Sequence, residues 1–207
     1  MPLRASVAER IFNPAIIPFY NLVSWPVGAI SGDMVVRQLS GLEPGSRVLD
    51  VGVGTGITAE KLVKRLGLVV DGIDVSRAML AEAKGKLPGS SILLHGDAAR
   101  LPFEAKSYDA VVYNYVLRYQ NIGQAENTLS EIPRVLKPGG MAIITDLNFP
   151  RLRPMGQPVG ESADALVLGA WSLFSHGEFK DYMSRMGMQY VRTLYPPLSF
   201  MIVFKKV

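Results

Sequence analysis

The sequence predicts an α/β fold with a mostly parallel sheet, helices on both faces and an antiparallel pair of strands at the end. Short apolar segments alternate with segments of helical spacing along residues 47–147, an order typical of a parallel sheet. Residues 188–194 and 199–204 are predicted as two further strands. The connection at Tyr195-Pro196-Pro197 is too short for a parallel crossover, so this last pair must be antiparallel.

The composition predicts one globular domain. The chain has 207 residues, of which 48% are hydrophobic and 19% charged. Its net charge of +4 is diffuse, without a run of Lys and Arg, so no nucleic-acid partner is expected. Cysteine is absent, which excludes disulfides, zinc–thiolate sites and cysteine nucleophiles. The two histidines are far apart in sequence, so no metal site is expected.

Residues 1–40 are predicted to form a helical cap. Residues 1–30 are rich in large apolar groups, but prolines at 14, 18 and 26 are expected to limit helix length, and a helix is expected over 31–39. The cap either packs on the core or serves as a lid or a lipid-contacting surface. Its apolar run is interrupted, so neither a membrane span nor a signal peptide is predicted. A cytoplasmic protein is expected, with peripheral membrane contact left open.

The remaining elements are expected in a regular order. Strands are predicted at 47–51, 68–73, 90–95, 108–114 and 141–147, and helices at 57–66, at 77–86 with Ser76 as cap, and at 122–136. A turn is expected at 137–140, a loop at 148–160, and helices at 163–174 and from a capping box at 175–178 to about 186.

The first strand runs into three glycines, Gly52, Gly54 and Gly56, followed by a predicted helix. Such glycines can adopt positive φ values and let the backbone approach a ligand at a helix N-terminus. A dinucleotide fingerprint would place a third glycine at position 57, where the chain has Ile57. A phosphate loop would place a lysine after Gly56, and none follows. Both phosphate-binding interpretations are therefore weakened.

Three acids surround this turn in the predicted sheet. Asp50 precedes the glycines, Asp74 ends the second strand and Asp97 follows the third. A carboxylate at the position of Asp74 suits a ribose diol, and Asp97 can accept a hydrogen bond from an adenine amine. Asp50 either contacts the ligand or orders the turn. Together the acids favour a ligand with an adenosine and a cationic group, and S-adenosylmethionine fits.

These segments resemble the class I methyltransferases that use S-adenosylmethionine. The resemblance rests on five motifs, at Val48–Gly56, Gly72–Leu80, Gly96–Phe103, Tyr108–Val112 and Val135–Gly140. It implies a Rossmann-like seven-stranded sheet with an antiparallel last strand. It also implies one methyltransferase domain over 1–207, with a cofactor-binding core at 47–147 and a substrate-side segment and final strands at 148–207.

A closer resemblance is to the ubiquinone/menaquinone C-methyltransferases. Residues 114–119 are similar to the Phe-Gly-Leu-Arg-Asn segment of that group, residues 11–21 to its N-terminal segment and residues 176–190 to its final helix and strand. Two features differ: Asn21 stands where the group has Asp, and the segment before the final helix is shorter. The resemblance implies a small hydrophobic acceptor, quinol-like or lipid-like and in one alternative derived from a membrane.

The predicted site follows from the motifs and their places in the sheet. Arg118 could instead make a salt bridge, Met79 could pack in the core, and Tyr20 could belong to a lid or to the core. Methyl transfer from a sulfonium needs mainly a well-placed nucleophile. The alternatives are a non-catalytic S-adenosylmethionine-binding module or partner subunit, and a dehydrogenase that binds NAD. The predicted catalytic residues are Arg118 and Tyr115, and the predicted cofactor-binding residues are Tyr20, Asp50, Gly52, Val53, Gly54, Gly56, Asp74, Val75, Met79, Asp97, Ala98 and Asn114.

Overall fold

A computed structural model describes residues 17–147, 176–196 and 199–207, and leaves out the side chains of 17–27 and 176–177. The predicted loop at 148–160 and the predicted helix at 163–174 lie outside these residues. So do the segment 1–16 and the side chain of Tyr20.

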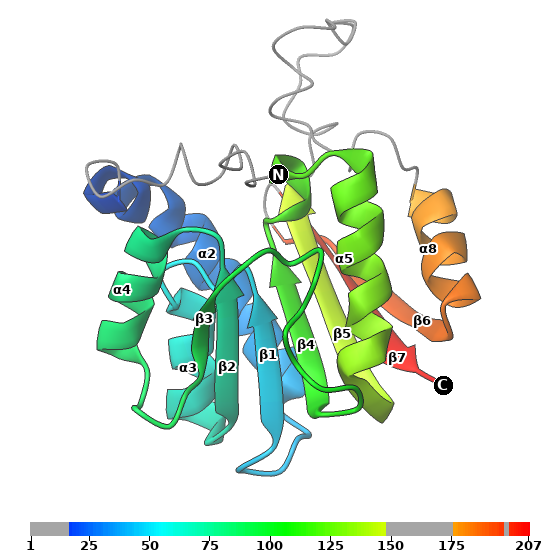
Figure 1. Ribbon diagram of the computed structural model, residues 1–207, viewed down its shortest axis with the longest axis horizontal. Helices are drawn as coiled ribbons and strands as arrows, with labels where there is room; N and C mark the ends of the chain where they lie inside the picture. The colour runs from blue at the N-terminus through cyan, green and yellow to red at the C-terminus, as the bar shows by residue number, and fades with distance from the viewer. Residues whose placement is uncertain (1–16, 148–175, 197–198) are drawn as a thin grey trace, which may run out of the picture.

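A seven-stranded sheet forms the centre of the protein, in the order β3-β2-β1-β4-β5-β7-β6 (Figure 1). The strands from β1 to β5 pair in parallel, whereas β7 is antiparallel to both of its neighbours, β5 and β6. The predicted fold class is therefore confirmed. The strands are β1 (Arg47–Val51), β2 (Val69–Asp74), β3 (Leu93–His95), β4 (Tyr108–Asn114), β5 (Leu136–Leu147), β6 (Met188–Leu194) and β7 (Ser199–Lys206).

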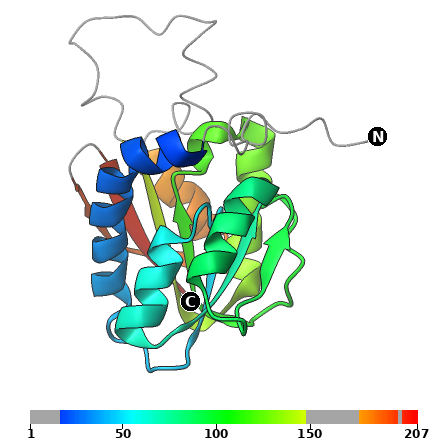
Figure 2. The ribbon, with the colours of Figure 1, turned by 90° about the vertical axis from the view of Figure 1, so that its left-hand side faces the viewer.

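Helices cover both faces of this sheet. Figure 2 shows α2 and α3 on one side and α5 on the other. The predicted helix starts at 57, 77 and 122 are confirmed, and the Ser76 hydroxyl caps its helix by accepting a hydrogen bond from the Met79 N–H at 3.3 Å. The helices are α2 (Ile17–Leu39), α3 (Ile57–Leu66), α4 (Arg77–Lys86), α5 (Ile122–Val135) and α8 (His176–Arg185), with a short 3₁₀ helix η1 (Leu117–Tyr119).

The helix α2 is longer than predicted. It runs unbroken for 23 residues, so the expectation that prolines would limit helix length in this segment is wrong. A proline at position 18 falls in the first turn, where its missing N–H costs nothing. At position 26 the helix continues, and contacts of its second half with α3 offset the lost bond. There Lys61 Nζ donates to Ala29 O at 2.6 Å and to Asp33 Oδ1 at 2.7 Å.

Two predicted boundaries of strands are also wrong. The third strand begins at Leu93 instead of residue 90. The predicted turn at 137–140 lies inside β5, where the pairing with β4 jumps from Tyr108–Leu136 to Ala110–Met141. The intervening residues form a bulge, and Gly139 has a φ of +78° there.

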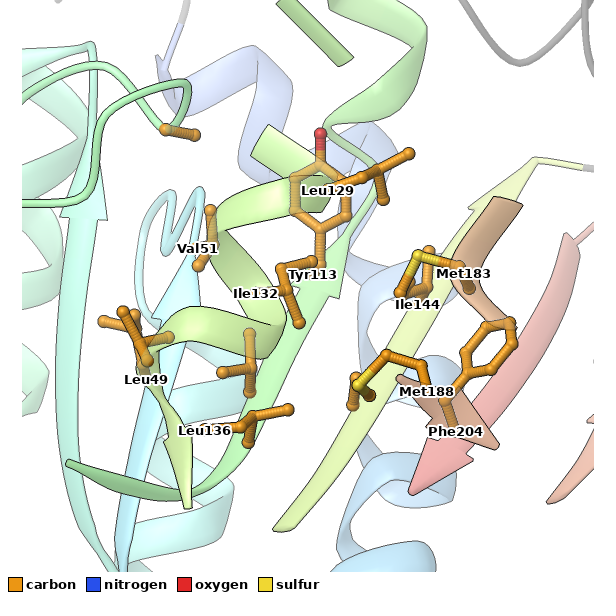
Figure 3. Packing of buried hydrophobic residues seen from close by; sticks show 14 of the residues in the cluster. Leu49, Val51, Tyr113, Leu129, Ile132, Leu136, Ile144, Met183, Met188 and Phe204 are labelled. Atoms are coloured by element: carbon orange, nitrogen blue, oxygen red, sulfur yellow. The ribbon is translucent and has the colours of Figure 1, made fainter. Parts of the chain in front are cut away.

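Alternation along the strands divides the core into two clusters. Leu49 and Val51 of β1 join the cluster under α5 and α8, which Figure 3 shows together with Tyr113, Leu129 and Phe204. The neighbouring Val48 points to the opposite face and packs with residues of α2 and α3. Because both faces are covered, the functional site lies at an end of the sheet.

Candidate functional site

A cavity of about 350 Å³ lies at the carboxyl ends of β1, β2 and β4, the end to which their arrowheads point in Figure 1. This volume is within the range of small-molecule sites, and ligands of open α/β sheets bind at this end. It brings together twelve of the fourteen predicted site residues. These are Asp50, Gly52, Val53, Gly54, Asp74, Val75, Met79, Asp97, Ala98, Asn114, Tyr115 and Arg118.

The three glycines of the turn differ in what surrounds them and in what a Cβ would meet at each position. All have positive φ, as predicted, with values of +76°, +53° and +78°. A Cβ on Gly54 would meet only the Gly52 carbonyl oxygen, at 3.9 Å, so the backbone is open to a ligand there. A Cβ on Gly56 would lie 3.1 Å from Cα of Ala83 in α4. Gly56 therefore lies against that helix instead of along the cavity.

Gly52 is held tightly against the segment after β4. A Cβ there would lie 2.2 Å from Cγ2 of Val116. Gly52→Ala is expected to lower the free energy of unfolding by about 2–4 kcal/mol, because it combines this overlap with a strained φ. Adding Val116→Ala should recover only the part due to overlap. Urea denaturation measures both, with Gly85→Ala as control because its Cβ would meet nothing within 4 Å; equal losses in the two Gly52 variants would contradict this account.

Asp74 ties the glycine turn to the next helix. Its Oδ2 accepts the Gly54 N–H at 2.8 Å and its Oδ1 accepts the Ser76 N–H at 2.8 Å. Burial raises the pKa of this carboxyl, while the two N–H groups and the nearby His95 act to lower it. Each oxygen keeps a second lone pair, so the carboxylate can still accept two hydroxyl donors.

Asp50 is a buried acid on the cavity wall. Only 2% of its surface is exposed, and burial together with the charge of Asp74 raises its pKa to about 7. The part of the chain that the structure describes supplies no hydrogen bond that lowers this pKa. A bound cation would stabilise the charged form of this carboxyl.

The residues predicted to hold the adenine lie around the ends of β2 and β3. Asp97 Oδ1 accepts the Ala99 N–H at 2.9 Å. Met79 and Ala98 are at most 8% exposed and also border the cavity, so Met79 both packs in the core and lines the site. His95 Nε2 lies 2.9 Å from the Val75 carbonyl oxygen, so this histidine links β3 to the segment after β2.

The end of β4 presents alternate side chains to the two faces. Tyr113 points into the core, where its hydroxyl bonds to Gln120 Oε1. Asn114 points the other way and borders the cavity. Its amide nitrogen and oxygen are both buried, and neither has a hydrogen-bond partner among the residues described. A buried amide without partners is costly, so a ligand is expected to bind it.

Tyr115 and Arg118 lie where β4 turns into η1. Tyr115 has a φ of +59°, uncommon outside glycine, and Cζ of Arg118 lies 4.8 Å from the centre of its ring. Burial raises the pKa of the Tyr115 hydroxyl, while Ser31, Ser199 and Arg118 act to lower it. Residues 31 and 199 come from α2 and β7, which the sequence did not connect with this site.

Arg118 also makes the salt bridge that was its alternative interpretation. Its Nε lies 3.2 Å from Oδ1 of Asp146, at the end of β5. Sequence reasoning missed Asp146. The available signal was its position, an acid at the carboxyl end of a predicted parallel strand, as for Asp74.

The described part of the chain contains no group of three His, Cys, Asp or Glu side chains that could hold a metal ion. Among the helices that the structure describes, none is long and apolar enough to cross a membrane.

Comparison with known proteins connects this geometry to a family. Residues 48–140 match the family model described as a methyltransferase domain. Over these residues the chain is similar to a methyltransferase domain. The predicted resemblance to methyltransferases that use S-adenosylmethionine is thereby confirmed. The matched residues include the glycine turn, Asp74 and Asp97, and they end inside β5.

Curated relatives named as methyltransferases are also similar to the chain. The chain is 39% identical over 120 residues to the demethylmenaquinone methyltransferase of Renibacterium salmoninarum. The match covers 58% of this chain and 49% of that protein. The chain thus spans about half the length of the curated relatives it matches.

Solved structures of similar fold have low sequence identity. An S-adenosylmethionine-dependent methyltransferase from Aquifex aeolicus has a TM-score of 0.69 and 20% identity, covering 95% of this chain and 100% of that one. A Haemonchus contortus phosphoethanolamine N-methyltransferase 2, solved with S-adenosylhomocysteine, has a TM-score of 0.76 and 17% identity, covering 97% and 59%. These likenesses support the fold.

Proposed function

We propose that this chain transfers the methyl group of S-adenosylmethionine to a small hydrophobic acceptor, with a quinol as the first candidate. The observation that carries the proposal is the cavity at the carboxyl ends of the strands. Three acids border it, together with the Asn114 amide, which has no hydrogen-bond partner among the described residues. These groups are acceptors for hydroxyl, amine and ammonium donors, which are the polar groups of that cofactor.

Each polar part of the cofactor has a residue of suitable chemistry. We assign the ribose to Asp74, the adenine amine to Asp97 and the ammonium group to Asp50. Asn114 and the open backbone at Gly54 suit the methionine portion. When bound, the cofactor supplies a methyl group on a sulfonium, whose leaving thioether is neutral and needs no acid.

Arg118 and Tyr115 are the proposed contacts of the acceptor. Because burial raises its pKa, Tyr115 is protonated at neutral pH and can donate a hydrogen bond but cannot serve as a base. The Arg118 guanidinium is a fixed cation at the cavity wall. It stabilises an ionised oxygen on the acceptor, which makes an aromatic carbon beside that oxygen more nucleophilic.

The quinol assignment draws on two sources. Residues 114–119 are similar to the corresponding segment of the ubiquinone/menaquinone C-methyltransferases, and the relatives quoted above carry the name of demethylmenaquinone methyltransferase. An acceptor of this class resides in a membrane, so we also propose that the protein meets its substrate at a membrane surface.

Transfer of labelled methyl groups tests the proposal. We expect the purified chain with S-adenosylmethionine to label a chemically reduced, short-chain prenyl naphthoquinol that lacks the ring methyl group. Protein and RNA pools should remain unlabelled. Label in a lipid extract but not in the naphthoquinol would show that the acceptor is a lipid other than this quinol.

Calorimetry separates the remaining alternatives. Tight binding of S-adenosylmethionine without transfer to any pool would favour a binding module or partner subunit. Binding of NAD in place of S-adenosylmethionine would overturn the proposal altogether.

A further inference from the structure

The guanidinium of Arg118 is held at several points. Its Nε donates to the Tyr115 carbonyl oxygen at 3.3 Å and lies 3.2 Å from Oδ1 of Asp146. Its Cζ lies 4.8 Å from the ring centre of Tyr115 and 5.5 Å from that of Tyr119. The side chain is 14% exposed and borders the cavity. The terminal amino groups have no partner among the described residues, so their four N–H donors remain available.

Asp146 holds both the backbone and the side chain of Arg118. Its Oδ2 accepts the Arg118 N–H at 3.2 Å, and its Oδ1 faces Arg118 Nε and also accepts the Leu147 N–H at 2.8 Å. The Asp146 side chain is 1% exposed and is not part of the cavity wall. It therefore acts on the site indirectly, and its side-chain contact there is with Arg118.

We propose that Asp146 is a positioning residue, which fixes the Arg118 guanidinium so that its terminal amino groups stay directed to the acceptor. The inference rests on the proposed function for the use of Arg118 in methyl transfer. An arginine side chain has several rotatable bonds, so it can adopt other rotamers unless its contacts hold it. The buried Asp146 carboxylate accepts the backbone N–H of Arg118 and forms an ion pair with its Nε, which itself donates to the Tyr115 carbonyl oxygen, so backbone and guanidinium are held together.

The geometry also explains why the cation is an arginine. Its Nε can pair with the Asp146 carboxylate and donate to the Tyr115 carbonyl oxygen while the terminal amino groups remain available on the other side of the same plane. A lysine has one charged nitrogen, so its contacts with Asp146 and with the acceptor would have to share that one atom.

Nuclear magnetic resonance tests the positioning without relying on activity. The side-chain N–H signal of Arg118 is assigned by its loss in Arg118→Gln. Because this Nε–H donates to the Tyr115 carbonyl oxygen, we expect it to exchange slowly with solvent. In Asp146→Asn the ion pair that holds the guanidinium at that carbonyl is lost, and we expect faster exchange. An unchanged exchange rate and chemical shift in that variant would overturn the proposal. Asp146→Glu, which keeps the charge on a longer arm, should retain a shifted but protected signal and serves if the asparagine variant does not fold.

The matched control is Asp109→Asn. Asp109 lies at the other end of β4 and also accepts one backbone N–H and one basic side chain, from Arg47 at 2.9 Å and Lys137 at 2.8 Å. Any general effect of removing such a carboxylate should appear in its melting temperature. The Arg118 signal and the kinetics should remain as in the wild type.

A double-mutant cycle then measures the consequence for methyl transfer to the naphthoquinol. We expect Asp146→Asn to lower kcat/KM by roughly 10–100-fold through misplacement of Arg118, with little change in the dissociation constant of S-adenosylmethionine. In the Arg118→Gln background the same substitution should cause no further loss. A further loss of equal size would show that Asp146 acts independently and would overturn the proposal. If the wild type transfers no methyl group, the proposed function fails, whereas the exchange measurement still decides the role of Asp146.

Discussion

Asp50→Asn is expected to make the protein more stable while it weakens the cofactor site. In the folded protein the pKa of Asp50 is about 7, above its ordinary value of 3.8, because the carboxyl is buried beside Asp74. The folded state therefore keeps a proton that the unfolded state loses, and stability falls as pH rises from about 4 to about 7. Asparagine removes this loss, which is worth up to about 4 kcal/mol at pH 8.

Two measurements check this expectation. Urea denaturation at pH 5 and pH 8 should show a decrease in the stability of the wild type that is absent from Asp50→Asn. Asp181→Asn, at an exposed position of α8, is the control and should behave like the wild type. A variant that loses stability at pH 8 would show that the charged form of Asp50 is favoured in the folded protein, contrary to the argument.

The same residue should make cofactor binding depend on pH. If Asp50 receives the ammonium group, its charged form binds best, so affinity of the wild type should rise as pH passes through about 7. Calorimetry in buffers of different ionisation enthalpy should detect release of a proton on binding below that pH. Asp50→Asn should bind more weakly and without this proton release. A wild-type affinity independent of pH between 6 and 8 would remove Asp50 from the ammonium site.

Asp74→Ala is the second substitution with a large expected effect. It deletes the proposed ribose acceptor and also the acceptor of the Gly54 and Ser76 N–H groups. We expect the affinity for S-adenosylmethionine to fall by about 1–3 kcal/mol, and by more if the glycine turn moves. Calorimetry measures the loss, with Glu82→Ala on the exposed side of α4 as control. An unchanged dissociation constant would contradict the ribose role.

Comparison of Asp74→Ala with Asp74→Asn separates loss of the ribose contact from displacement of the glycine turn. Asp74→Asn keeps an acceptor oxygen for one N–H group, so the turn should persist while the ribose contact weakens. Crystal structures or backbone spectra of both variants would show whether Gly54 moves. If the alanine variant alone displaces the turn, part of its loss in affinity comes from the backbone.

The local sequence was sufficient to predict much of the cavity wall around the glycine turn. Gly52, Gly54 and Asp74 were predictable because a tight turn and the end of a parallel strand leave direct traces in residue type and spacing. The structure adds that Gly52 faces Val116 and that Gly56 faces α4, so two of the glycines are needed for packing. Such contacts join segments far apart in the chain, and the motif alone does not contain them.

The acceptor side was less predictable for the same reason. The bond from Asp146 to Arg118 joins β5 to η1, and Ser31 and Ser199 reach Tyr115 from α2 and β7. These proximities depend on strand order and helix placement. The proline rule failed at α2 because it describes an isolated helix, whereas packing on α3 supports this one.

The place of β7 between β5 and β6 has a consequence for folding during synthesis. Among the described strands, β6 pairs with β7 alone, although β6 is synthesised before β7. The side of β5 away from β4 also has no partner strand until β7 is made. The five parallel strands can therefore assemble while one edge of the sheet remains unpaired. An unpaired edge can pair with other chains. Until residues 199–206 leave the ribosome, this edge of β5 is therefore open to pairing with other chains.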